Sequence, residues 1–151
     1  MSDLRELYQE VILDHSKRPR NFGALPGATS QADGYNPLCG DRATIYVRLE
    51  GDRLQELRFV GQGCSISTAS ASLMTEVLKG KTRAEVEQLF ERFHALITSP
   101  PDQQRDTPAP ELGKLAVFSG VSEFPVRVKC ASLAWHTLKA ALEQGGTVST
   151  E

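Results

Sequence analysis

The stretch from residue 41 to residue 64 reads DRATIYVRLEGDRLQELRFVGQGC and carries the strongest structural pattern in the chain. Apolar residues alternate with polar ones on both sides of a Gly-Asp pair, which is typical of a β-hairpin with one buried face. A two-residue turn would pair Ile45 with Arg58 and bring charge into the apolar face. A three-residue loop at 51–53 pairs Ile45 with Phe59 instead, so the sequence predicts this second register.

Helical patterns flank the hairpin on both sides. Apolar spacing predicts a first helix that ends before Pro19, a second over 65–79, a third that begins at Thr82 and a last one that begins near Pro125. The stretch 20–38 has loop composition with room for one short strand, and the proline-rich stretch 99–110 is expected to form a surface loop or an inserted segment. The apolar positions of the last helix are expected to be buried, and the residues after it to be frayed. These positions are Val126, Cys130, Leu133, Ala134, Leu138 and Ala141.

Composition excludes several classes of protein. The chain has 151 residues and a formal net charge of −2, so it shows neither the basic footprint of a nucleic-acid binder nor a polybasic membrane anchor. No apolar run approaches the roughly 18 residues of a membrane span. The charged segment MSDLRELYQE has no signal core, which predicts a cytoplasmic protein. Three cysteines in a reducing compartment point to metal binding or thiol chemistry.

The predicted register brings distant ligands together. Cys39 and Asp41 lie two residues apart in NPLCGD, and the hairpin places Asp41 opposite the residue before Cys64. Cys130 lies early in the last helix, on its apolar stripe, where Arg127 and Lys129 are near enough in sequence to offset negative charge. Three sulfurs and one carboxylate suit tetrahedral zinc, or iron with sulfide.

Each of these signals also has a purely structural interpretation. Taken alone, Cys130 is typical of a buried core cysteine. The Cys-x-Asp pattern alone is typical of a loop, and Arg127 and Lys129 are typical of solvated charges on a helix. The GQGC turn at 61–64 lacks the lysine of a phosphate-binding loop. A Cys–His hydrolase is disfavoured, because His136 lies about 240° around the helix from Cys130.

Four motifs in this order resemble the IscU/NifU-N family of iron–sulfur cluster assembly proteins. They are DHSKRPRNFG (14–23), NPLCGD (36–41), GQGCSIST (61–68) and PVRVKCASLAW (125–135). The long spacer between Cys64 and Cys130 resembles the SufU branch, as does Lys129, where IscU-type members carry a histidine. The resemblance implies one α+β domain over 1–151, with a small antiparallel sheet of about three strands covered on one face by helices and an inserted segment around 82–112.

The resemblance also implies a function. It implies zinc bound by Cys39, Asp41, Cys64 and Cys130, with sulfur accepted as a persulfide on Cys39 from a SufS-type cysteine desulfurase and passed to downstream assembly or acceptor proteins. Arg127 is expected to shape the site. Such a protein resembles a zinc-dependent sulfurtransferase more than a conventional enzyme. Two alternatives stay open: a scaffold that builds an iron–sulfur cluster on the three cysteines, and a zinc-stabilised interaction module.

Overall fold

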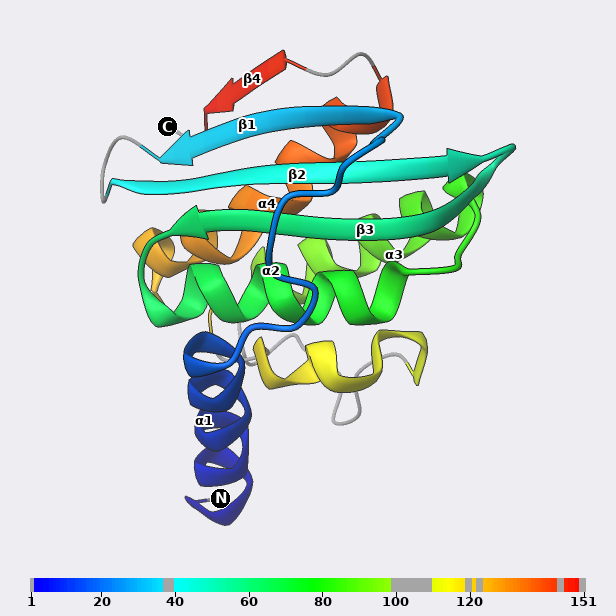
Figure 1. Cartoon of the computed structure of the whole chain (residues 1–151). Helices are drawn as coiled ribbons and strands as arrows, with labels where there is room; N and C mark the ends of the chain where they lie inside the picture. The colour runs from blue at the N-terminus through cyan, green and yellow to red at the C-terminus, as the bar shows by residue number, and fades with distance from the viewer. Residues whose placement is uncertain are drawn as a thin grey trace.

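A four-stranded sheet packed on helices makes up the described part of the chain (Figure 1). The computed structural model describes residues 2–36, 40–98, 110–118, 121, 124–143 and 146–149. The elements in chain order are α1 (Ser2–Lys17), β1 (Ser30–Asn36), β2 (Asp41–Glu50), β3 (Arg53–Gln62), α2 (Ser65–Leu78), α3 (Arg83–Thr98), the 3₁₀ segment η2 (Pro110–Phe118), α4 (Pro125–Glu143) and β4 (Gly146–Ser149).

The β2–β3 hairpin has the predicted register but a different turn. Ile45 pairs with Phe59, as expected. However, Glu50 pairs with Arg53, so the turn has two residues, and Gly51 takes the positive φ of 62° that a type II′ turn needs at this position. The expected three-residue loop is therefore wrong. A β-bulge beyond the turn supplies the extra residue and restores the apolar pairing.

The sheet has the order β3-β2-β1-β4, and its first three strands are antiparallel, as expected. The fourth strand was not expected. Gly146–Ser149 pairs in parallel with residues 32–35 of β1, so the prediction that this segment is frayed is wrong. The pairing supplies backbone partners to a sheet edge that would otherwise be open.

The helices cover one face of the sheet. In Figure 1, α4 passes behind the strands and α2 runs below β3. α4 packs on β1 and β2, and α2 packs on β3. α1 extends away from the sheet and packs against α2. The predicted helix starts are close to those observed, and the Thr82–Glu85 capping box at the start of α3 is present, with reciprocal bonds of 3.0 and 3.2 Å. No helix in the described ranges combines the length and apolarity that crossing a bilayer requires.

The buried stripe of α4 differs from expectation at one end. Cys130, Leu133, Ala134, Leu138 and Ala141 are buried, whereas Val126 is 53% exposed. Val126 lies in the first turn of α4, and only the later turns meet the helices and strands around them. Of the predicted loop at 99–110, residues 99–109 lie outside the described residues, and the insertion around 82–112 stays a prediction.

Candidate metal centre

Four elements meet at one side of the molecule. β2 begins, β3 ends, and α2 and α4 both begin on the left of Figure 1. Asp41 is the first residue of β2, Cys64 lies between β3 and α2, and Cys130 is in the second turn of α4. One donor atom of each lies within 4.8 Å of the others. Cys39 lies outside the described residues and is separated from Asp41 by Gly40 alone.

The Asp41 carboxylate is held in place from the next strand end. Asp41 is 1% exposed, and its Oδ1 accepts a hydrogen bond from the Cys64 backbone N–H at 3.0 Å. Its Oδ2 lies 3.8 Å from Cys64 Sγ. The hairpin register brings these residues together, because Arg42 pairs with Gln62 one step earlier in the ladder. A buried carboxylate anchored by one oxygen is well placed to serve as a metal ligand.

Cys64 caps helix α2 with its sulfur. The Sγ atom accepts a hydrogen bond from the Ser67 N–H at 3.4 Å. A hydrogen bond from the Cys130 thiol lowers the pKa of Cys64 from its ordinary 9.0 to about 6, and the N–H groups of Ser67 and Ile66 add to this, while burial and Asp41 oppose it. The lowered pKa favours the thiolate form of Cys64, and the thiolate is the form that binds metals.

A serine fixes α4 relative to α2 next to the site. Ser70 Oγ donates to the carbonyl of Ala131 at 2.5 Å, and the same Ser70 hydroxyl oxygen accepts a hydrogen bond from Trp135 Nε1 at 3.2 Å. Ser70 lies in α2, and Ala131 directly follows Cys130. This bond pins the start of α4 against α2 and so sets the separation of Cys64 and Cys130.

The donor set fits a tetrahedral zinc ion. Zinc takes cysteine sulfurs at about 2.3 Å and carboxylate oxygens at about 2.0–2.2 Å, so neighbouring donors lie about 3.3–3.8 Å apart around it. Asp41, Cys64 and Cys130 already come within 4.8 Å of one another. A small contraction would bring all three onto one ion, and closed structural zinc sites have a fourth protein ligand.

The rim of the site carries cations and apolar side chains from the start of α4. Arg127 is exposed and Lys129 half-buried, both within the turn that precedes Cys130. Phe124 is 60% exposed, and Val126 is exposed beside it.

Histidines do not join the cluster. His15 is buried between helices, with Nδ1 2.7 Å from Ser72 Oγ. His136 packs edge-on against Phe90, with ring centroids 5.3 Å apart, and burial lowers its pKa. Within the described ranges, the only group of three or more metal-ligating residues is Asp41, Cys64 and Cys130. A cysteine with a histidine base, as in a hydrolase, is absent from this group.

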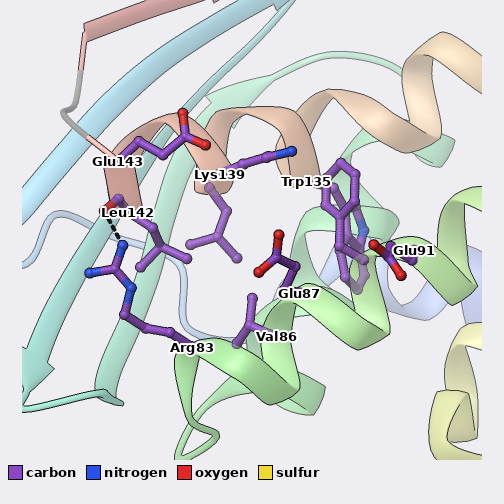
Figure 2. A pocket seen from close by; sticks show the side chains of 10 residues that line it. Arg83, Val86, Glu87, Glu91, Trp135, Lys139, Leu142 and Glu143 are labelled. Carbon is purple, nitrogen blue, oxygen red and sulfur yellow. Dashed lines mark hydrogen bonds between the residues drawn. The ribbon is translucent and has the colours of Figure 1, made fainter.

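A separate pocket of about 180 Å³ lies between α3 and α4 (Figure 2). Its apolar lining includes Trp135, and Glu87 and Lys139 contribute charge. At one end Arg83 donates to the carbonyl of Leu142 at 2.8 Å, which caps the end of α4. None of the three donors of the site lines this pocket.

Two residues of the site were not indicated by the sequence pattern. Ser67 supplies a backbone N–H to Cys64, and Gly63 packs directly against the Asp41 carboxylate. The glycine in the GQGC turn was the available signal, because a glycine at a close approach between chain segments leaves room for another group.

Comparisons with known proteins agree on one family. The model of the NifU-like N terminal domain matches residues 7–131. The zinc-dependent sulfurtransferase SufU of Bacillus subtilis is 40% identical over 147 residues, covering 96% of this chain and 97% of that protein. The iron–sulfur cluster assembly scaffold protein IscU of Streptococcus pyogenes is 39% identical over 145 residues, covering 95% of this chain and 87% of that protein.

A solved structure supports the same assignment. A protein of Fervidobacterium islandicum, described as a scaffold for iron–sulfur cluster assembly in the SUF system, superposes with a TM-score of 0.81. It is 34% identical, with 91% of this chain and 98% of that chain covered. The α+β fold implied by the sequence motifs is thereby confirmed.

Proposed function

Because the chain belongs to the family of NifU-like N-terminal domains, we propose that it serves iron–sulfur cluster assembly by accepting sulfur from a cysteine desulfurase at a zinc-bound cysteine site. The observation that carries this proposal is the convergence of Asp41, Cys64 and Cys130 from three distant parts of the chain. The similarity to a zinc-dependent sulfurtransferase over nearly the whole chain supports zinc as the metal.

Cys39, Asp41, Cys64 and Cys130 would hold the zinc ion. When bound, zinc keeps its cysteine ligands deprotonated. Asp41 is oriented by the Cys64 N–H, and Cys64 is oriented by its capping bond to Ser67. These second contacts hold the donors in place.

Cys39 is the proposed sulfur acceptor. Its thiolate attacks the outer sulfur of the desulfurase persulfide, a new S–S bond forms on Cys39, and the old S–S bond breaks with the desulfurase cysteine leaving as thiolate. The step transfers sulfur without net oxidation. Cys64 is tied to the start of α2 and Cys130 is 1% exposed, which supports Cys39 as the thiol that meets the partner. Docking of the desulfurase would release Cys39 from the metal.

The surface beside the site fits such a partner. Phe124 and Val126 offer exposed apolar side chains, and Arg127 is an exposed cation three residues before Cys130. We assign Arg127 the role of favouring the Cys39 thiolate during transfer. Downstream assembly or acceptor proteins would then take the sulfur.

Mass spectrometry tests the acceptor directly. After incubation with a SufS-type desulfurase and free cysteine, the wild-type protein should gain sulfur, and peptide mapping should locate it on Cys39. Cys39→Ala should gain none, because the attacking thiolate is missing. Sulfur adducts that appear unchanged in Cys39→Ala would refute the assignment.

Cluster scaffolding is the second candidate function, and the similarity to the Streptococcus pyogenes scaffold protein favours it. In that case the cysteines would hold iron and sulfide as cargo. Aerobic purification separates the two functions. A colourless protein with stoichiometric zinc supports sulfur transfer, whereas a brown protein with visible absorption supports scaffolding.

A further inference from the structure

We propose that Gly63 is a positioning residue for Asp41, and that the absence of a side chain at residue 63 is what lets the Asp41 carboxylate take its place in the metal site. This inference rests on the zinc site of the proposed function. It assigns to the glycine a role in metal affinity that is separate from any role in the turn.

Gly63 has no room for a side chain on the side that faces Asp41. A methyl group placed on Gly63 would lie 2.5 Å from Asp41 Oδ1 and 2.8 Å from its Cγ. Favourable contacts between such atoms lie at roughly 3.5–4.0 Å, so the methyl and the carboxylate exclude each other. Any side chain at residue 63 therefore has to displace Asp41 or the backbone that carries it.

Backbone conformation does not account for the glycine. Gly63 is not among the described residues with positive φ, so an alanine adopts its backbone without strain. Gly40 is the opposite case, since its φ is 76° and a methyl there would meet nothing within 4 Å. Gly40 is therefore required for its backbone conformation, whereas Gly63 is required because a side chain there would overlap with Asp41.

The carboxylate has nowhere else to go that keeps its contacts. Asp41 is 1% exposed, and Oδ1 is held by the Cys64 N–H at 3.0 Å. Gly63, which has no side chain, lies directly beside Oδ1 of Asp41. A displaced carboxylate loses the Cys64 bond and also moves Oδ2 from its place 3.8 Å from Cys64 Sγ. Both effects act on the donor geometry.

A double-mutant cycle on zinc affinity tests this inference. Competition with a coloured chelator gives the zinc affinity of the wild type, Gly63→Ala, Asp41→Ala and the double variant. Gly63→Ala should weaken zinc binding about ten- to hundredfold, as the loss of a supporting contact does at metal sites. In the Asp41→Ala background, Gly63→Ala should leave the zinc affinity nearly unchanged, because the carboxylate that the methyl group displaces is gone.

Two further measurements separate a positioning role from a general structural one. The absorption spectrum of the cobalt-substituted Gly63→Ala protein should resemble that of Asp41→Ala. Gly80→Ala is the matched control: Gly80 has a φ of 85° with open space around it, at the far end of α2, so the change should lower stability and leave zinc affinity unchanged. If Gly63→Ala fails to fold, the double variant should fold, because the two closest contacts of the added methyl, Asp41 Oδ1 and Cγ, are gone and only the Cβ at 3.1 Å remains.

Several results would overturn the inference. These are an unchanged zinc affinity in Gly63→Ala, an equal loss with and without the Asp41 carboxylate, or a failure of both variants to fold. A wild-type protein that binds no zinc would overturn the proposed function together with this inference. If the wild type binds zinc and Gly63→Ala binds it with the same affinity, this inference alone is overturned.

Discussion

Cys64 combines a structural and a chemical role in one sulfur atom. Its Sγ caps α2 through the Ser67 N–H, and the same atom belongs to the cluster with Asp41 and Cys130. The position of Cys64 ahead of a helix was predictable from the GQGC turn. The bond from its N–H to Asp41 was not, because that bond depends on how closely two strand ends approach, which a residue pattern does not specify.

Substitution of Cys64 should separate its two roles. Serine is a good helix N-cap, whereas alanine is a poor one. Both Cys64→Ser and Cys64→Ala should bind zinc more weakly than the wild type. In urea unfolding of the metal-free proteins, Cys64→Ala should be less stable than Cys64→Ser by about 0.5–2 kcal/mol. Equal stabilities would show that a hydrogen-bond acceptor on the side chain of residue 64 does not stabilise the start of α2.

His15 should make stability depend on pH. Burial lowers the pKa of His15, and Arg20 and Lys114 act in the same direction while Glu76 and Asp14 oppose them. The folded state therefore takes up a proton less readily than the unfolded chain, whose histidine titrates near 6.5. Stability is fully present above that pKa and falls as the pH drops through 6.5 toward the folded value.

The matched variant for this effect is His15→Gln, which keeps a polar group without a charge change. Thermal unfolding followed between about pH 7 and pH 5 should show a steeper loss of stability in the wild type than in the variant. Parallel pH profiles would mean that His15 is not the group responsible.

At the scale of elements, the β2–β3 hairpin shows what the alternation of apolar and polar residues can and cannot predict. The pairing of Ile45 with Phe59 followed from the need to keep one face apolar. The turn did not follow, because the same pairing arises from a longer loop or from a tight turn with a bulge. The choice depends on local backbone geometry at Gly51 and in the strand beyond it.

The contact between α2 and α4 should carry a measurable part of the stability. Ser70→Ala removes the hydroxyl that bonds both Ala131 O and Trp135 Nε1, leaving buried polar groups without this partner. We expect a loss of about 1–3 kcal/mol in the free energy of unfolding by denaturant titration. Ser132→Ala is the control, since its hydroxyl bonds only within α4, to Lys129 O, and it should cost less.

At the scale of the whole molecule, long-range packing decides what the sequence left open. The alternation in β2 and β3 predicted that Asp41 and Cys64 meet, because one hairpin joins them. The approach of Cys130 required α4 to pack beside α2, and the apolar stripe indicated only that α4 is buried. β4 was not predicted, because a strand of four residues at a sheet edge is too short to show a clear alternation of apolar and polar residues.

Removal of zinc should destabilise the protein without unfolding it. The sheet, α2 and α4 form a core of buried apolar residues, and a chain of this length does not need a metal to fold. Chelation should lower the melting temperature, since a ligand present at 100 times its Kd adds about 2.7 kcal/mol of stability. Circular dichroism should still report a folded protein. Complete unfolding on chelation would favour the zinc-stabilised interaction module.

The central claim is that three sulfurs and one carboxylate bind a single zinc ion. X-ray absorption at the zinc edge on the purified protein measures this most directly. We expect one zinc per chain with three sulfurs at about 2.3 Å and one oxygen at about 2.0–2.2 Å, and one sulfur fewer in Cys130→Ala. A zinc shell without sulfur, or a sulfur count that Cys130→Ala leaves unchanged, would contradict it.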